Sequence, residues 1–404
     1  MSALLIGPVR AAEAPNEIKI GHLHASSGPF ASISMPTYYG LKLWVDRSNA
    51  AGGTMVKPFG RKIPLRLISY DDQSNPGTAA TLINQLITQD KVDLLISDQG
   101  SVLTAVAVPI AREHKMFLFD PGGTGAEFFT KDNPYIALLV APESTVWPKY
   151  LAEYLNAAGA AAGLKTVALL YTTNDFTGTQ ANALKKYIND AGKLKIVYDQ
   201  GVPTSTSSYT VLINNIAAKQ PDAVIALGYP GNDIAFLRNL QGSGHTFKFV
   251  FTVYPGLESA LLLQNVGIGG LEGVFTYVTG ASYEYKVNAG LNLPAFAKLW
   301  AETYANTPGA DFGQNAVAGY TVGLILQETL AHTASMDQLA LRDAVFGLSG
   351  KLVTISGPFE LNSTGAQIGE IMPLGQVEPN GKGGMQLVVV YPPNLANGTA
   401  KLGR

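Results

Sequence analysis

The sequence predicts an α/β protein with two Rossmann-like, doubly wound lobes. A chain of 404 residues with 47% hydrophobic residues is too long for one core, since single cores usually split beyond roughly 250–300 residues. Short strand-like apolar runs alternate with amphipathic helical segments, and the alternation forms two successive series that divide near Pro142. The order strand–helix–strand implies parallel sheets with right-handed crossovers.

The first series contains four expected strands and three expected helices. The strands are Ile18–Leu23, Leu65–Tyr70, Leu94–Ser97 and Met116–Phe119, and the helices are Tyr38–Ala50, Gly77–Asp90 and Leu103–His114. The helix after Pro76 has the clearest beginning, because Asn75 can cap it and proline suits the first helical position.

The second series repeats this pattern and is followed by a helical region. Its strands are Thr166–Tyr171, Lys195–Tyr198, Ala223–Leu227, Phe249–Val253 and Gly273–Tyr277, and its helices are Thr145–Asn156, Gly178–Ala191, Thr210–Lys219 and Asn232–Gly242. Further helices are expected at Pro294–Thr303, Ala316–Ala334 and Met336–Val345, before a strand- and turn-rich end from Val353 to Tyr391. No linker is rich enough in Gly and Ser to tether independent domains, so we expect the lobes to share a hinge.

The composition excludes several classes of protein. The formal net charge is −2, so no basic field favours nucleic acid as a partner. The absence of cysteine excludes disulfides, iron–sulfur clusters and thiol nucleophiles. No segment offers about 18 uninterrupted apolar residues, so we expect no membrane-spanning helix.

Residues 1–16 are expected to lie outside the folded lobes. Leu4, Leu5 and Ile6 form a short apolar patch, and Arg10–Ala14 contains small residues suited to signal-peptidase cleavage. We interpret this segment as a signal-peptide remnant, with a disordered tail as the alternative, and expect a periplasmic protein.

The sequence shows no constellation of catalytic or metal-binding residues. No histidine pairs with another at metal-ligand spacing on a helix, and no Gly-x-Ser-x-Gly motif occurs. His22 and His24 can share a strand face, and Asp71 with Asp72 could bind a cation, but packing and turn capping are commoner roles. The glycine-rich run 267–273 precedes a strand, so we interpret it as a turn. We expect no enzyme activity, no metal and no cofactor.

Three loops after expected strands are rich in glycine and hydroxyl residues: Ala25–Pro29, Ser97–Ser101 and Asp120–Gly125. The carboxyl ends of parallel strands lie at one edge of a sheet, where ligands of open α/β folds bind. Backbone amides in such loops can donate to an anion. Ordinary turn chemistry would explain one of these loops, but three at one edge favour an anion site.

Several segments resemble the branched-chain amino-acid-binding protein family. They are Ile18–Gly21 with Ser27–Pro29, Asn49–Gly53, Gly60–Ile63, Tyr70–Pro76, Asp120–Thr124, Pro221–Val224 with Gly228–Tyr229, and Gly357–Phe359. Each motif is short, but their order and spacing from about residue 17 to 375 are specific together. The resemblance implies the type I periplasmic binding fold and a monomeric extracytoplasmic receptor that delivers a small molecule to an ABC permease.

The resemblance also implies three crossovers between the lobes, near Ala141, Thr279 and Ser356. The first lobe would then combine residues 17–140 with 280–355. The second lobe would combine residues 141–279 with 356–395.

Five ligand-binding positions of the family fall on loops of the first lobe. Gly100 and Ser101 occupy the place that supplies an amide and a hydroxyl to a ligand carboxylate. Gly122, Gly123 and Thr124 occupy the place of a second loop, which supplies further amides and a hydroxyl. An alternative role for Ser101 is to cap the next helix.

Four more positions are expected to surround the ligand. Ile33 stands about where the family often has an aromatic residue, Phe176 lies near an aromatic of the second lobe, and Tyr229 matches a tyrosine that covers the ligand, with core packing as its alternative. Amino-acid-binding members place an acid after the strand at 249–253 to pair with the ligand ammonium, but here Tyr254 stands there and Glu258 is the nearest acid downstream.

This departure changes the expected ligand. An ammonium buried without a counter-charge costs several kcal/mol, so the site disfavours amino acids. We expect an aromatic or branched organic carboxylate, with stacking contacts from tyrosine and phenylalanine. The alternatives are a receptor for branched-chain amino acids or amides, and a ligand-sensing regulator with the same fold.

Overall fold

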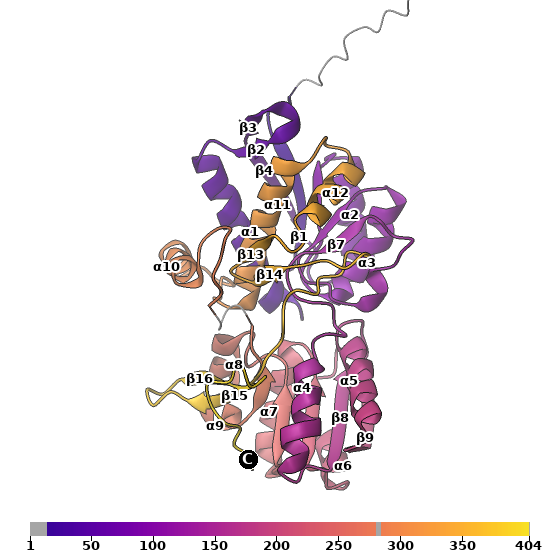
Figure 1. The fold of residues 1–404 in the computed structure, drawn as a ribbon, viewed down its shortest axis with the longest axis vertical. Helices are drawn as coiled ribbons and strands as arrows, with labels where there is room; N and C mark the ends of the chain where they lie inside the picture. Colours follow the sequence, from indigo (N-terminus) through magenta and orange to yellow (C-terminus); the bar gives the residue numbers. More distant parts are fainter. Residues whose placement is uncertain (1–13, 280–283, 404) are drawn as a thin grey trace, which may run out of the picture.

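The computed structural model describes residues 14–279 and 284–403, which form two α/β lobes stacked along the long axis of the molecule (Figure 1). Most of the expected leader or tail, residues 1–13, lies outside the described residues. The two lobes have separate sheets, and each sheet is built on parallel strands.

The first lobe surrounds a five-stranded parallel sheet with the order β4-β1-β5-β6-β7. Its strands are β1 (Ile18–His24), β4 (Leu65–Asp71), β5 (Leu94–Ile96), β6 (Leu118–Asp120) and β7 (Ile136–Leu138), with a separate hairpin of β2 (Thr54–Val56) and β3 (Arg61–Ile63). Its helices are α1 (Ala31–Ala50), α2 (Pro76–Thr88), α3 (Ser101–Glu113), α10 (Leu293–Tyr304), α11 (Gln314–His332) and α12 (Gln338–Gly347). Helices from both ends of the chain therefore cover one sheet.

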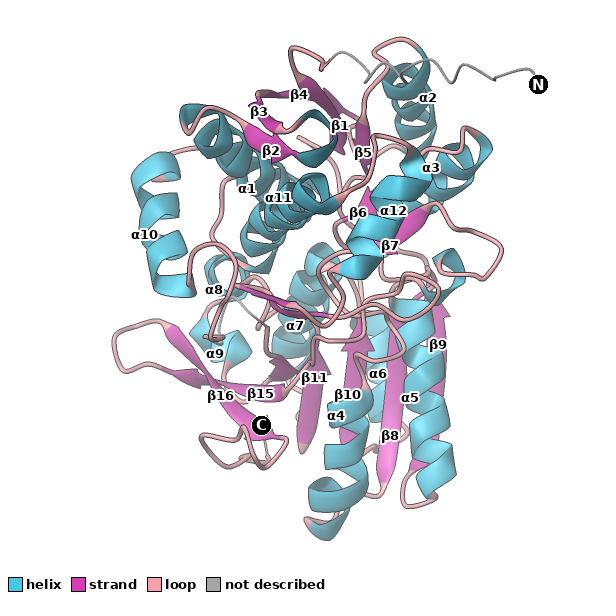
Figure 2. Ribbon diagram, turned by 45° about the horizontal axis from the view of Figure 1, so that its top comes forward, coloured by secondary structure: helices cyan, strands magenta, loops and turns pink. Residues whose placement is uncertain are grey.

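The second lobe surrounds a seven-stranded sheet with the order β16-β15-β12-β11-β10-β8-β9. The parallel strands are β8 (Thr166–Thr172), β9 (Lys195–Val202), β10 (Ala223–Leu227), β11 (Phe249–Thr252) and β12 (Phe275–Tyr277), and β15 (Leu374–Pro379) and β16 (Met385–Tyr391) extend the sheet antiparallel. The helices are α4 (Lys149–Tyr154), α5 (Thr177–Ala191), α6 (Thr210–Ala217), α7 (Pro230–Ser243), α8 (Ser259–Val266) and α9 (Ile268–Leu271). Figure 2 shows the parallel strands running toward the first lobe.

Both sheets use the same parallel order, in which the first strand of the series lies between the second and the third. In each sheet the strand order reverses direction next to the first strand of the series. This point lies between β1 and β5 in the first lobe and between β8 and β10 in the second lobe. Ligands of doubly wound folds bind at this switch point. The topology therefore puts two switch points at the facing edges of the lobes.

Three passages of chain join the lobes, between β7 and α4, between β12 and α10, and between β14 (Gly357–Phe359) and β15. After the hairpin of β13 (Leu352–Thr354) and β14, the chain still contacts the first lobe, since the amide of Leu138 donates to the carbonyl of Gly365 at 2.9 Å. We therefore propose that the first two passages lie where the lobe boundaries were expected and that the third follows Gly365 rather than Ser356.

Some element boundaries differ from the sequence-based expectation. Helix α1 begins at Ala31 rather than Tyr38, because Pro36 is accommodated inside it. The helix expected at Thr145–Asn156 begins only at Lys149 and passes into a π-helical turn at 155–159. The run at 267–273, expected as a turn, includes the short helix α9.

Helices α1 and α11 pack with their backbones in direct contact. A methyl group on Gly40 would lie 2.8 Å from the amide nitrogen of Tyr320, and one on Gly319 would overlap the backbone carbonyl of Thr37. Only residues without a Cβ allow this approach. The crossing holds α11, which comes late in the sequence, against the N-terminal helix of the same lobe.

We predict that Gly319→Ala lowers the free energy of unfolding by about 1–3 kcal/mol, because the methyl group forces the two helices apart. Urea denaturation measures the loss. Gly178→Ala is the matched control, since a methyl there meets no atom within 4 Å. Equal stabilities of the two variants would contradict the close crossing.

Candidate ligand-binding cleft

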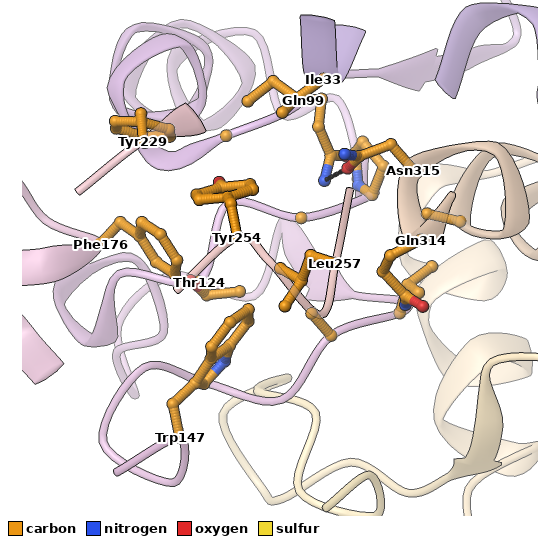
Figure 3. Close-up of a pocket in the computed structure, with 16 residues that line it drawn as sticks. Ile33, Gln99, Thr124, Trp147, Phe176, Tyr229, Tyr254, Leu257, Gln314 and Asn315 are labelled. Carbon is orange, nitrogen blue, oxygen red and sulfur yellow. Dashed lines mark hydrogen bonds between the residues drawn. The ribbon is translucent and has the colours of Figure 1, made fainter. Parts of the chain in front are cut away.

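A cavity lies where the carboxyl ends of the two sheets face each other (Figure 3). It measures about 40 Å³, which exceeds the roughly 10–15 Å³ that a single water needs. The residues that line it are Ile33, Gln99, Gly100, Pro121, Gly122, Thr124, Val140, Ala141, Trp147, Phe176, Tyr229, Tyr254, Leu257, Gln314, Asn315 and Ala318. Both switch points contribute, through the loops after β5, β8 and β10.

The beginning of α3 forms one wall. Gly100 precedes the helix with a φ of 97°, which residues with a Cβ rarely adopt. Ser101, the next residue, is fully buried and is not among the residues that line the cavity, and its Oγ has no hydrogen-bond partner among the described residues. The amides of Ser101 and Val102 face the hydroxyl oxygen of Tyr229. Burial raises the pKa of this tyrosine, although the two amides act in the opposite direction.

The loop after β6 is held by Asp120, which corrects the expected role of two glycines. The amides of Gly122 and Gly123 donate to Asp120 Oδ1 at 3.3 and 2.9 Å, so they are already paired and do not point to a ligand. Gly123 packs against Thr104 outside the cavity lining. Thr124 lines the cavity, and its hydroxyl is paired with Ser144 Oγ at 2.8 Å.

Asp120 is fully buried, and Ser97 and Thr104 also donate to its Oδ1, at 3.0 and 3.1 Å. Burial raises the pKa of Asp120 to about 7, against the opposing effect of these hydrogen bonds. The side chain therefore acts as a hub that fixes the loop.

A second buried acid, Asp98, holds the loop after β5. Its Oδ1 accepts the hydroxyl of Ser34 at 2.5 Å and the amide of Gln99 at 2.6 Å. Burial and the neighbouring Asp72 raise the pKa of Asp98 well above its usual range. Asp71 instead accepts a hydrogen bond from the amide of Ser26. No cluster of three potential metal ligands occurs in residues 14–279 and 284–403.

Aromatic rings form another part of the lining, and one of them, Tyr229, reaches the beginning of α3. The rings of Trp147 and Phe176 lie 5.0 Å apart, those of Phe176 and Tyr229 lie 5.5 Å apart, and Tyr254 follows at 6.5 Å from Tyr229. The indole Nε1 of Trp147 donates to the carbonyl of Pro142, so this ring is fixed in place. Figure 3 shows the phenylalanine and tyrosine rings on one side and the amide side chains of Gln99, Gln314 and Asn315 on the other.

Tyr254 and Glu258 occupy different parts of the lobe interface. The amide of Tyr254 donates to buried Asp233, which holds the ring at the cavity. Glu258 is also buried, and its Oε1 accepts both the amide nitrogen and the Nδ2 of Asn315 at the beginning of α11. Burial raises the pKa of Glu258 to about 8, against the opposing effect of these bonds. Glu258, the nearest acid downstream of Tyr254 in the sequence, is thus hydrogen-bonded to the opposite lobe.

The two lobes touch directly around the cavity. The amide of Gln314 donates to the carbonyl of Leu257 at 3.1 Å, and the rings of Phe30 and Tyr229 pack edge to face at 5.1 Å. Together with the bonds of Glu258 to Asn315, these contacts describe lobes that have closed on each other.

Sequence reasoning missed Trp147, Gln99, Leu257 and Asn315. Trp147 was placed inside an expected helix, whereas it lies before α4 on the passage between the lobes. Gln99 lies in the glycine- and hydroxyl-rich loop Ser97–Ser101. Its position directly after a buried strand is the signal that could have identified it. Asn315 begins α11, and nothing local to it indicates that the helix would point at the other lobe.

The two histidines of β1 lie away from the cleft. His22 and His24 both bond to Ser69 Oγ, at 3.2 and 2.8 Å, and stack with Tyr38. Burial lowers the pKa of His22 to about 3, so its imidazole is neutral. Core packing explains both residues.

Two doubly wound lobes with a cavity between them are the architecture of a two-lobed ligand-binding protein. The family model described as "Periplasmic binding protein" matches residues 17–383, and the chain belongs to this family. The family consists of extracytoplasmic binding proteins rather than enzymes. None of the helices within the described residues has both the length and the apolar character needed to cross a bilayer.

Curated relatives and solved structures agree with this family. The chain is 23% identical to Leu/Ile/Val-binding protein homolog 7 of Brucella melitensis over 353 residues, 85% of this chain and 84% of the relative. A leucine-binding protein of Thermotoga maritima superposes with a TM-score of 0.76 at 17% identity, over 93% of this chain and 99% of that one. A solute-binding protein of R. palustris in complex with benzoate gives 0.71 at 20% identity, over 96% and 97% of the chains.

We predict that Asp120→Asn makes stability less dependent on pH. The pKa of Asp120 in the folded protein, about 7, lies above its ordinary value of 3.8. Between these two pH values the folded protein therefore binds more protons than the unfolded chain. The wild type thus loses stability as the pH rises from 3.8 to 7. The difference in unfolding free energy, variant minus wild type, should rise by on the order of 3 kcal/mol from pH 4 to pH 8.

Urea denaturation at several pH values measures this difference. Ser97→Ala is the control, because it removes one donor to the same oxygen but keeps the carboxyl group, so the decline with pH should persist. A pH-independent difference between Asp120→Asn and the wild type would contradict the buried, proton-binding carboxyl.

Proposed function

We propose that the chain is the periplasmic receptor of an ABC importer and that it closes its two lobes around a small aromatic carboxylate. The observation that carries the proposal is the composition of the cavity lining. It combines Gly100, at the beginning of a helix, with several aromatic rings. The buried hydroxyl of Ser101, which has no partner among the described residues, follows Gly100 directly. Glu258, the nearest acid downstream of Tyr254 in the sequence, is hydrogen-bonded to Asn315.

The anion half of the site is the beginning of α3. A helix of 13 residues presents the positive end of its dipole at this point, and its first amides face the hydroxyl oxygen of Tyr229. A carboxylate that takes the place of this hydroxyl oxygen at the amides of Ser101 and Val102 would also receive the hydroxyl of Ser101. The burial of this polar group would then be compensated by charge-assisted hydrogen bonds.

The ring half of the site favours a flat ligand. Trp147, Phe176, Tyr229 and Tyr254 are held by ring contacts with one another, by the bond from the Trp147 indole to a backbone carbonyl and by the bond from the Tyr254 amide to Asp233, so the aromatic surface is preorganised. Aromatic rings on such a surface gain edge-to-face and stacking contacts beyond the burial of apolar area.

An α-amino acid fits this arrangement less well. Tyr254 replaces the expected acid, and Glu258 already accepts two hydrogen bonds from Asn315. A buried ammonium would therefore lack a free carboxylate, and the penalty for an unpaired charge is large.

Similar proteins support both ligand classes. A solute-binding protein of R. palustris in complex with 4-hydroxybenzoate superposes with a TM-score of 0.74 at 17% identity, over 93% of this chain and 97% of that one. The Brucella relatives carry the name of Leu/Ile/Val-binding proteins. A receptor for branched-chain amino acids or amides is therefore the second candidate, and a sensor that binds the same ligand without a permease is the third.

We predict that benzoate-like acids raise the melting temperature of the protein more than leucine, isoleucine, valine or small amides do at equal concentration. A ligand that binds only the folded state stabilises it by mass action, so a thermal-shift screen followed by isothermal titration ranks the classes. Tight binding of leucine without binding of any aromatic acid would replace the proposal by its second candidate.

We predict that Ser101→Ala weakens the binding of an aromatic acid about tenfold to a hundredfold, because hydrogen bonds to charged groups contribute about 1.5–3 kcal/mol. Isothermal titration measures the loss. The control is Ser208→Ala on the exposed surface of the second lobe, which should bind like the wild type. An unchanged affinity in Ser101→Ala would remove the carboxylate from the beginning of α3.

A further inference from the structure

Gln99 lines the cavity and carries a buried hydrogen-bond acceptor without a partner among the described residues. Its Nε2 donates to Asn315 Oδ1 at 3.0 Å, while its Oε1 is buried without a hydrogen-bond partner in the described part of the chain. The side chain lies across Gly122, where a methyl group would lie 2.8 Å from its amide carbon. The backbone of Gln99 is fixed as well, since its amide donates to Asp98.

The orientation of this amide group is imposed from the opposite lobe. Glu258 Oε1 accepts the backbone amide of Asn315 at 3.4 Å, so this oxygen acts as an acceptor whether the carboxyl is ionised or neutral. Asn315 must then turn its NH₂ group to Glu258 and its oxygen to Gln99. Gln99 in turn must donate through Nε2, which leaves Oε1 as the unpaired atom of its amide group within the described residues.

The relay Glu258–Asn315–Gln99 crosses the lobe interface. Glu258 follows β11 in the second lobe, whereas Asn315 and Gln99 belong to the first lobe. The acceptor is therefore oriented only when the lobes are in contact. Specificity that depends on it is a property of the closed form.

We propose that this relay makes Gln99 the specificity-determining residue of the polar end of the cavity, which selects carboxylates that carry a hydroxyl or N–H donor. The proposal rests on the proposed function, the binding of a small carboxylate. A neutral donor satisfies one buried acceptor without adding a charge. A ligand without the donor leaves Gln99 Oε1 unpaired, and sites built in this way reject such ligands strongly.

The test compares matched ligands by isothermal titration. The probes are 3- and 4-hydroxybenzoate, the corresponding methoxybenzoates, which accept but do not donate, and benzoate. We expect the wild type to bind one hydroxybenzoate at least tenfold more tightly than its methoxy counterpart. Gln99→Met, which keeps the length of the side chain but removes the acceptor, should reduce this ratio to about threefold or less, whereas the exposed control Gln89→Met should keep it.

Variants of Glu258 test the relay apart from direct contact. Glu258→Met removes the acceptor that orients Asn315, so the amide groups of Asn315 and Gln99 can turn. The ratio of the affinities for the hydroxy and methoxy acids should then fall, although Asn315 and Gln99 themselves are not substituted. Glu258→Gln keeps an acceptor oxygen and should restore the ratio. Circular dichroism and the melting temperature establish that each variant is folded.

The outcomes separate the two proposals. Equal affinities of the wild type for hydroxy and methoxy acids, or an unchanged ratio in Gln99→Met, would overturn the role of Gln99 and leave the binding of aromatic carboxylates in place. Preference for leucine over every probe would overturn the proposed function, and the same preference in Gln99→Met would overturn the role of Gln99 as well. Failure of all the probes to bind would also overturn both.

Discussion

The cleft depends on one constraint, the parallel direction of the strands in both sheets. Parallel strands need crossovers, so every loop after a strand emerges at the same edge and leads into the beginning of a helix. Because both lobes have the same parallel strand order, their switch points face each other across the hinge. The beginning of α3 supplies amides from one side, and the loops after β8 and β10 supply Phe176 and Tyr229 from the other.

Buried carboxyl groups keep these loops in place. Asp98, Asp120, Asp233 and Glu258 each accept at least one backbone amide from a segment beside the cavity. Burial raises the pKa of each of them, so protonation can remove charge that would otherwise be desolvated. This matters for an anion site, because four ionised carboxylates near the cavity would repel a carboxylate ligand. Hydrogen-bonded acids give the rigidity of a polar network with less negative charge.

The sequence was sufficient where a role depends on neighbours along the chain. The periodicity predicted the strands and helices that build both lobes, and Gly100, Thr124, Phe176, Tyr229 and Tyr254 all line the cavity. Roles that depend on competition between partners were not accessible: the amides of Gly122 and Gly123 are taken by Asp120, only two and three residues earlier. Asn315 was missed for a different reason, because more than 200 residues separate it from Gln99 and only the tertiary fold brings them together.

Closure also completes a helix. The residue before α11 is Gly313, which has no side chain to cap it, and the first amides of the helix find their acceptors in the other lobe, at the carbonyl of Leu257 and the carboxyl of Glu258. In an open form water would satisfy these amides instead. The amides at the beginning of α11 are therefore hydrogen-bonded in both the open and the closed form. The free energy difference that they contribute between the two forms is small. Such a balance allows the contacts made by a ligand in the cavity to decide whether the lobes stay closed.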